Sequence, residues 1–421
     1  MADRPRPFFP RVEEVVSPKG IRAYLVTERS VPFLTLALHF RAGAVLDPPD
    51  RCGLATMVAG LLDEGAGPYD SQAFRRELED NAIRLTFDAD LDGFTGTLKT
   101  LTATRDHAFD LLRLALLEPR FDPEPIERIR SQIQAELRRR ESDPDYVSAR
   151  AWYARAFDGH GYGRPVRGTL ETIARIRRED LVGFARERLA RADLAIGVAG
   201  DIGPEELAVL LDRTFGGLPE RSAPVEPPPT EPRLGDTVLV PMPIPQSVVT
   251  FGRKGIARND PDYYAATIAN YILGGGGFSS RLMQEVREKR GLAYSVYTYL
   301  ADVRLAPLWL GAVATSNERV ARSIALVREE VARLAEGEID DRELADAKTY
   351  LTGSFPLRLA TNDQLARMLL GMMVHGLGRD YLERRNELVS AVGPEDLRRV
   401  CRRLYAGPLL VAVAGRPEGL E

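Results

Sequence analysis

The sequence predicts an α+β fold of two homologous lobes, each an antiparallel-rich sheet covered by helices, which face each other across a cleft. Three observations support this fold class. Neighbouring strands are followed by runs of helices, short motifs recur in the same order in both halves, and a proline-rich segment separates the halves. The chain has 421 residues, 44% of them hydrophobic, which is enough for about two to four domains with cores of their own.

The first half begins with strands and continues with helices. Strands are expected at 22–27 and at 33–41, where leucine and phenylalanine alternate with smaller or polar residues, so that one face is buried. Two more strands are expected within 83–101, joined by a turn at Asp92-Gly93, and a last one at 194–200. Helices are expected at 53–62, 70–81, 105–117, 124–140, 146–157, 170–188 and 205–215.

The second half repeats the first. Val31-Pro32 recurs as Ile244-Pro245 and Asp47-Pro48 as Asp260-Pro261, each pair 213 positions apart, and two tripeptides follow at nearly the same offset. Residues 217–236 are rich in proline, which resists helix and central strand and favours an extended spacer. We therefore predict an N-terminal lobe at 1–216, a linker at 217–236 and a C-terminal lobe at 237–421.

Composition excludes several classes of protein. The net charge of −4 offers no global attraction for nucleic acid or anionic membrane. There is no run of 18 apolar residues for a membrane span, and residues 1–19 lack the apolar segment of a signal peptide. The expected location is the cytoplasm, or the periplasm if a signal segment has been removed. Cys52 and Cys401 are too far apart in sequence to indicate a disulfide framework or a metal site.

The most informative stretch is 274–297. Four glycines precede a helix that Ser279 or Ser280 can cap, Gly291 ends the helix in the left-handed conformation, and a strand follows. Arg287 and Tyr294 lie at this junction, where a guanidinium and a phenol could converge on one oxygen-rich ligand. The alternative is structural, because the helix dipole favours an arginine near a helix C-terminus and tyrosine packs well in strands.

The motif running from Phe278-Ser279-Ser280-Arg281-Leu282 to Tyr294 resembles that of the pitrilysin/insulinase-type zinc metallopeptidases, also called inverzincins. The resemblance extends over essentially the whole chain and includes Gly53-Leu54-Ala55 and Gly161-Tyr162-Gly163. It implies that Arg287 and Tyr294 help to hold the substrate backbone against a metal centre. It also suggests that Gly276 and Gly277 lie beside the substrate.

The sequence departs from this family at the metal site. The family requires H-x-x-E-H on the first-lobe helix, whose two histidines ligate zinc while the glutamate activates water. Here Thr56 and Gly60 stand at the two ligand positions and Ala59 at the base position. Glu136 matches a later ligand position and is expected to be an isolated remnant, since catalytic zinc requires three protein ligands. We therefore expect no metal or other cofactor in this chain.

No other site replaces the lost one in the sequence. The four histidines are not spaced as metal-binding pairs, so structural roles are expected for His39, His107, His160 and His375. No G-x-S-x-G motif for a serine nucleophile occurs, and the glycines at 274–277 are not followed by the Lys-Ser/Thr of a phosphate loop.

The resemblance implies a non-catalytic subunit of a two-chain peptidase, similar to the auxiliary subunits of bacterial two-chain peptidases and processing peptidases. Zinc would belong to a paralogous partner subunit, in a heterodimer or larger assembly. This chain would donate Arg287 and Tyr294 and be inactive alone. Substrates would be peptides, which a strand edge of the second lobe could bind by β-pairing.

Two other functions remain open. The first is a structural or peptide-binding homologue without a proteolytic role, as in core subunits of respiratory complexes. The second is a self-sufficient hydrolase with an unrecognised site.

Overall fold

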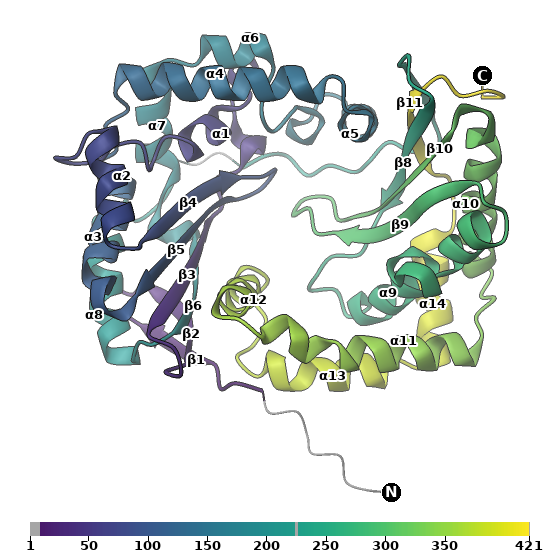
Figure 1. Cartoon of the computed structure of the whole chain (residues 1–421). Coiled ribbons are helices and arrows are strands. Elements are labelled where there is room, and N and C mark those ends of the chain that lie inside the picture. Colours follow the sequence, from purple (N-terminus) through teal and green to yellow (C-terminus); the bar gives the residue numbers. More distant parts are fainter. Residues whose placement is uncertain (1–8, 224–225, 421) are drawn as a thin grey trace, which may run out of the picture. The chain divides into compact units, whose positions relative to one another are not determined.

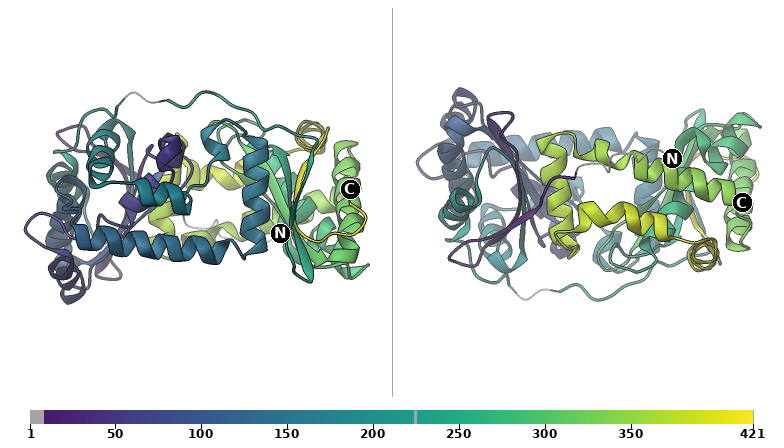
Figure 2. Two further views of the ribbon diagram at one scale, coloured as in Figure 1. Left: turned by 90° about the horizontal axis from the view of Figure 1, so that it is seen from above. Right: turned by 90° about the horizontal axis from the view of Figure 1, so that it is seen from below.

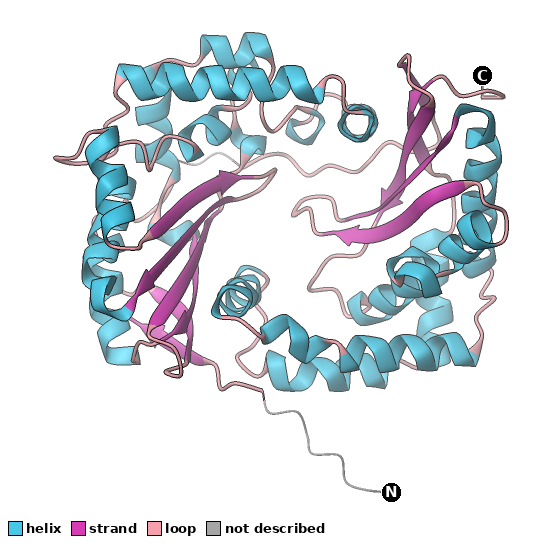
Figure 3. Ribbon diagram, in the orientation of Figure 1, coloured by secondary structure: helices cyan, strands magenta, loops and turns pink. Residues whose placement is uncertain are grey.

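The computed structural model describes residues 9–223 and 226–420, and within these ranges the chain forms two compact units. Unit 1 comprises residues up to 137, 165–227 and 355–384, and unit 2 comprises 138–164, 228–354 and 385 onward. Residues 1–8, part of the stretch considered for a signal segment, and linker residues 224–225 lie outside the description. Figure 3 shows that each unit contains a β-sheet with helices packed against it.

The sheet of unit 1 has the strand order β1-β2-β6-β3-β5-β4. Its strands are β1 (Glu13–Val16), β2 (Arg22–Thr27), β3 (Phe33–Phe40), β4 (Arg84–Ala89), β5 (Phe94–Leu101) and β6 (Leu194–Gly200). All neighbours are antiparallel except β2 and β6, which are parallel. The predicted turn at Asp92-Gly93 joins β4 to β5, since Asp90 N–H donates to the Gly93 carbonyl at 2.9 Å.

Helices of unit 1 cover both faces of this sheet (Figure 1). They are α1 (Leu54–Ala59), α2 (Ser71–Asp80), α3 (Arg105–Leu117), most of α4 (Pro123–Arg140), α6 (Leu170–Arg175), α7 (Arg178–Arg188), α8 (Pro204–Phe215) and α12 (Asn362–Val374). Figure 2 shows α4 as one uninterrupted helix. The predicted helix at 170–188 is interrupted, because Ile176 and Arg177 adopt extended backbone between α6 and α7.

The sheet of unit 2 repeats this topology with the order β7-β11-β8-β10-β9. Its strands are β7 (Thr237–Pro241), β8 (Gln246–Lys254), β9 (Ala293–Ala301), β10 (Leu308–Ser316) and β11 (Leu410–Gly415). Strands β7 and β11 are parallel, as β2 and β6 are, and the other neighbours are antiparallel. The matching strand order confirms two homologous α+β halves; unit 1 adds only β1.

Most helices of unit 2 come from the second half of the chain. They are α9 (Tyr263–Asn270), two π-helices (Tyr271–Gly275 and Met283–Glu288), α10 (Val320–Ala335), α11 (Asp341–Gly353), α14 (Pro394–Tyr405) and, from the first half, α5 (Pro144–Ala156). Helix α13 (Tyr381–Ala391) passes from unit 1 into unit 2. Short 3₁₀ turns lie at 44–46, 49–51, 102–104, 161–163, 191–193, 277–279, 317–319 and 355–359.

The two halves exchange a helix. In unit 2, α5 packs on the sheet, where Trp152 Nε1–H donates to the Leu410 carbonyl at 3.0 Å. In unit 1, α12 lies so close to β6 that a Cβ at Gly197 would be 2.3 Å from the Ala366 carbonyl oxygen. The lobe boundaries predicted at 216 and 237 separate the two duplicated segments of the sequence, and they remain a prediction. The compact units of the structure are divided differently, because each consists of three separate stretches of the chain.

Helix α12 also buries part of the second face of β3. One face was expected to be buried, and Thr35 and Ala37 on the other face are buried as well, because α12 covers them. Thr35 Oγ1–H donates to Asp363 Oδ1 at 2.6 Å. Among the described residues, no helix has the length and hydropathy needed to cross a bilayer.

Candidate functional site

The segment 271–301 of unit 2 differs locally from the helix and strand expected. The helix after the glycines is a π-helix over Met283–Glu288, preceded by two α-helical residues at 281–282, and its apolar residues Leu282, Met283 and Val286 are buried. Gly291 has φ +58°, as expected for a left-handed helix end. The chain then enters β9, which pairs only with β10 in the sheet.

The expected serine cap is absent. The hydroxyls of Ser279 and Ser280 donate back to the carbonyls of Gly276 and Gly277, at 2.8 and 2.7 Å, instead of accepting from helix N–H groups. Gly277 has φ +59°, which favours glycine, and a Cβ at Gly276 would be 2.8 Å from the Tyr271 carbonyl oxygen. These two glycines therefore shape a tight turn, and their predicted contact with substrate remains a prediction.

The structure brings Arg287 and Tyr294 together. The guanidinium carbon of Arg287 lies over two rings, 4.7 Å from the Phe278 centroid and 5.0 Å from the Tyr294 centroid. We call Phe278, Arg287 and Tyr294 the Arg287 cluster. Its tyrosine is 81% exposed and its phenylalanine 65%.

The donors of this cluster make no hydrogen bond within the described part of the chain, although Arg287 forms an ion pair there. Tyr294 O–H makes no hydrogen bond there, and the nearest anion to Arg287 is Glu288, whose Oε1 lies 3.5 Å from Nε. Since a guanidinium presents five N–H donors and a phenol presents one, the cluster can donate several hydrogen bonds to an oxygen-rich ligand.

Helix α11 anchors the segment that carries the cluster. Arg281, at the start of the second π-helix, donates Nε–H and Nη2–H to the carboxylate of Glu343 at 2.7 and 2.6 Å. Burial alone would raise the pKa of Glu343, but the hydrogen bonds from Arg281 hold it below its usual range. Tyr350, on the same helix, stacks on Tyr271 of the first π-helix with centroids 5.0 Å apart.

Sequence reasoning missed this anchor. Arg281 and Glu343 are 62 residues apart, and no motif or periodicity connects them. The i, i+7 spacing of Glu343 and Tyr350 places both on one face of a helix, but only the tertiary structure shows what that face contacts.

The expected metal positions lie on α1 in unit 1 and are filled by apolar packing. All residues of α1 are buried. Thr56 Oγ1–H donates to the Val166 carbonyl at 3.1 Å, and a Cβ at Gly60 would be 3.2 Å from Ile129 Cγ2 on α4. Ala59 has no polar side-chain atom and is 4% exposed.

These residues do not fit zinc. A hydroxyl already bonded to a carbonyl, a methyl group and a glycine supply no nitrogen, sulfur or carboxylate ligand. Glu136 on α4 is half-buried and already interacts with other groups of the chain. Throughout residues 9–223 and 226–420, no group of three or more histidine, cysteine, aspartate or glutamate side chains is placed to hold a metal ion.

A charged cluster directly follows α1 and was not predicted. Glu64 is 6% exposed and accepts from Ser71 Oγ–H at 2.6 Å and from both terminal nitrogens of Arg128 at 3.0 and 2.6 Å. Burial and the neighbouring Glu64 raise the pKa of Asp63 to about 6. Arg128 and Arg75 both form ion pairs with Glu64 and neutralise its charge, so we assign this cluster a structural role.

The histidines contact structural partners. His107 Nε2 lies 2.9 Å from Glu77 Oε2, and His160 Nδ1 accepts from the Tyr162 N–H at 3.1 Å. Burial lowers the pKa of His39. His375 follows the last residue of α12, and its backbone N–H donates to the Gly371 carbonyl at 3.1 Å.

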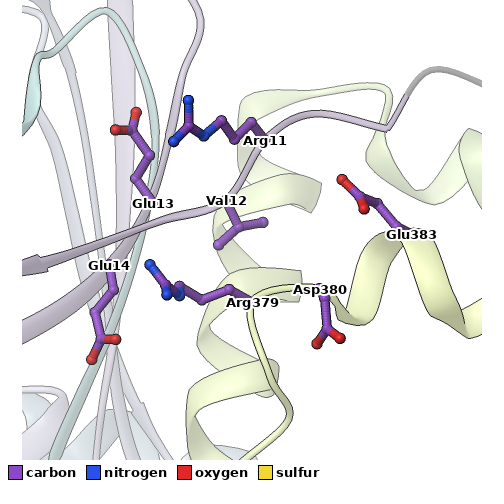
Figure 4. A pocket seen from close by; sticks show the side chains of 7 residues that line it. All are labelled: Arg11, Val12, Glu13, Glu14, Arg379, Asp380 and Glu383. Carbon is purple, nitrogen blue, oxygen red and sulfur yellow. The ribbon is translucent and has the colours of Figure 1, made fainter.

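Unit 1 contains a hollow of about 540 Å³, far in sequence from the Arg287 cluster. Figure 4 shows the side chains that line it. It is lined by Val12 and six charged residues: Arg11, Glu13, Glu14, Arg379, Asp380 and Glu383. Glu14 is paired with Arg22, and Asp380 with Arg384. The hollow has no histidine or cysteine in its lining, and its four acidic side chains lie beside two arginines, so we assign it no role.

Comparisons with known proteins place the chain in a family. Residues 23–170 match the model described as Insulinase (Peptidase family M16), and residues 175–351 match Peptidase M16 inactive domain. The non-peptidase homolog YmxG of Helicobacter pylori is 30% identical over 333 residues, covering 79% of this chain and 77% of that protein. An uncharacterized zinc protease of Streptomyces coelicolor is 26% identical over 436 residues, covering 96% and 89%.

Solved structures agree. The crystal structure of a peptidase M16 inactive domain from Pseudomonas fluorescens has a TM-score of 0.91 and 26% identity, covering 97% of this chain and 100% of that one. A chain of complex III from Candida albicans shares the fold, with a TM-score of 0.81 at 18% identity and 97% coverage of both chains. The chain therefore belongs to the insulinase family of peptidases, family M16.

Proposed function

We propose that this chain is the zinc-free auxiliary subunit of a two-chain peptidase, in which a paralogous partner carries zinc and hydrolyses peptides. The observation that carries the proposal is the contrast between the two sites. The Arg287 cluster keeps an exposed Tyr294 hydroxyl with no hydrogen bond in the described chain beside a half-buried guanidinium, whereas the positions of the metal ligands are filled by apolar packing.

The donors suit a peptide carbonyl. The N–H groups of Arg287 hold the carbonyl oxygen, and Tyr294 O–H stabilises the negative charge that develops on that oxygen when water attacks. Positioned donors of this kind are a large contribution to peptide hydrolysis, because they gain strength as the charge develops. Gly277, in the turn before the second π-helix, has open space where a Cβ would lie, which leaves room for a substrate backbone, and Gly276 shapes the same turn.

The partner supplies the Lewis acid and the general base that this chain lacks. The partner we expect is a family member with an intact H-x-x-E-H motif, since that motif supplies two histidine ligands and the glutamate base. Substrates are peptides or unfolded segments, because the cluster recognises backbone oxygen rather than a folded surface.

One observation favours a second function. The Helicobacter pylori relative is named a non-peptidase homolog, which fits a structural or peptide-binding protein without any role in proteolysis. The two functions differ in the expected use of the cluster. A scaffold does not need the Tyr294 hydroxyl, whereas an auxiliary subunit loses turnover without it.

The test is reconstitution. The tagged chain is purified from its native host, and a co-eluting family member with H-x-x-E-H is expressed separately. We expect zinc at one equivalent in the partner and none in this chain by metal analysis. We expect peptidase activity from the mixture and little from either protein alone.

Two results contradict the proposal. The first is stoichiometric zinc with peptide cleavage in the isolated chain, which favours a self-sufficient hydrolase. The second is a partner whose activity is the same with and without this chain, which favours the scaffold.

A further inference from the structure

Phe278 is an exposed aromatic residue next to the proposed donors. It lies in the turn between the two π-helices, and its ring centroid is 4.7 Å from the guanidinium carbon of Arg287. A phenylalanine that is 65% exposed gains little from burial, and the contact it does make is with the Arg287 guanidinium.

The helix register brings Arg287 to this ring. Over Met283–Glu288 the backbone is a π-helix, which changes the direction of each side chain relative to an α-helix of the same length. Arg281 is fixed to Glu343 at the start of the helix, and Leu292 N–H donates to the Val286 carbonyl at 2.9 Å at its end. Between these fixed ends, the guanidinium of Arg287 reaches both Phe278 and Tyr294.

Aromatic contact and hydrogen bonding use different parts of a guanidinium. A ring attracts the cation through the face of the guanidinium plane, whereas the N–H groups point outward within that plane. The contact with Phe278 therefore restricts the arginine side chain, while its N–H groups make no hydrogen bond to the described part of the chain.

We propose that Phe278 is a positioning residue for peptide capture: its ring holds the Arg287 guanidinium in the orientation that presents the N–H edge to a peptide carbonyl. The peptide part rests on the proposed function. The contact between the ring and the guanidinium can be tested without any peptide.

The first experiment observes the Arg287 Nε–Hε signal by nuclear magnetic resonance in the full-length ¹⁵N-labelled chain. The signal is identified by its loss in Arg287→Lys. The aromatic ring of Phe278 should displace the chemical shift of the Arg287 Hε through its ring current. We expect Phe278→Leu, which keeps an apolar side chain but removes the ring, to reduce this displacement. Phe278→Tyr should preserve this displacement. The control is Tyr299→Leu, which replaces an exposed tyrosine on β9, the strand that carries Tyr294, and should not affect the displacement.

The second experiment measures anisotropy of fluorescein-labelled oxidised insulin B chain added to the same variants. We expect Phe278→Leu to bind about two- to fivefold more weakly, the effect of one exposed cation–π contact, and Phe278→Tyr to bind like the wild type.

An unchanged Arg287 signal in Phe278→Leu overturns the proposal. A displaced signal with unchanged peptide affinity overturns it as well, because the orientation then has no effect on capture. If the wild type binds no peptide, the proposed function fails, and the signal alone decides whether Phe278 holds Arg287.

Discussion

Replacing Tyr294 by phenylalanine removes one oxygen atom from the proposed site and little else. The side chain is 81% exposed, and its hydroxyl makes no hydrogen bond with the described part of the chain. The phenyl ring that remains can keep its place 5.0 Å from the Arg287 guanidinium. The free energy of unfolding should therefore change by less than about 0.5 kcal/mol, as for most surface substitutions.

The expected catalytic effect is much larger. If Tyr294 O–H stabilises the charge that develops on the substrate carbonyl, its loss raises the barrier by about 2 to 4 kcal/mol. That range corresponds to a reduction of about 30- to 1000-fold in rate. Since the bond strengthens in the transition state, kcat should fall more than KM rises.

The assay uses the complex with the zinc-bearing partner. Steady-state hydrolysis of a fluorogenic peptide gives kcat and KM for the wild type, Tyr294→Phe and the control Tyr297→Phe. Tyr297 is also on β9 and is 48% exposed, but it stacks on Tyr299 and has no contact with Arg287. Thermal unfolding of each chain alone measures stability.

A value of kcat within about twofold of the wild type, in an intact complex, refutes the role of the hydroxyl, because such a change is only about 0.4 kcal/mol. An equal loss in Tyr297→Phe refutes its specificity. A marked drop in Tm for Tyr294→Phe shows that the hydroxyl has a structural partner instead.

Three further predictions concern stability, each measured by denaturant or thermal unfolding. Asp63→Asn should stabilise the chain above pH 6 and weaken its pH dependence. The pKa of Asp63 is raised to about 6, mainly by burial, so the wild type loses stability as the pH rises from about 4 to 6. An unchanged profile contradicts this reasoning. Gly197→Ala should destabilise by more than about 4 kcal/mol, because the new Cβ would be 2.3 Å from a backbone oxygen of α12; Gly183→Ala, with open space around it, is the control. Glu343→Gln should weaken the anchor of the second π-helix by about 1 to 3 kcal/mol, with Glu395→Gln as an exposed control. Equal effects of Glu343→Gln and Glu395→Gln refute the anchor.

Much of the fold could be predicted because its signals are local. Alternating apolar residues located β3, and the helix expected at 70–81 forms as α2, where Asp70 accepts from the Ala73 N–H at 2.8 Å. The duplication was visible in repeated dipeptides and reappears as the same strand order in both sheets. The exchange of α5 and α12 could not be predicted, because an amphipathic helix does not specify which sheet it covers.

The candidate site was predicted less completely. The motif identified Arg287 and Tyr294, and the structure brings them together. The expected serine cap was wrong, because both serine hydroxyls donate to glycine carbonyls instead. The helix that follows is a π-helix, and Arg281 at its start is bound to Glu343 of α11, a contact between residues far apart in the sequence.

By itself, the sequence determined the family, the loss of the zinc ligands at Thr56, Ala59 and Gly60, and the retention of an arginine and a tyrosine seven positions apart. These are properties of residue identity and spacing. Only the tertiary structure decided what fills the former metal site, which helix covers which sheet, and that Phe278 packs on Arg287. Such contacts join residues through space, and their energies depend on distance and burial that no local pattern records.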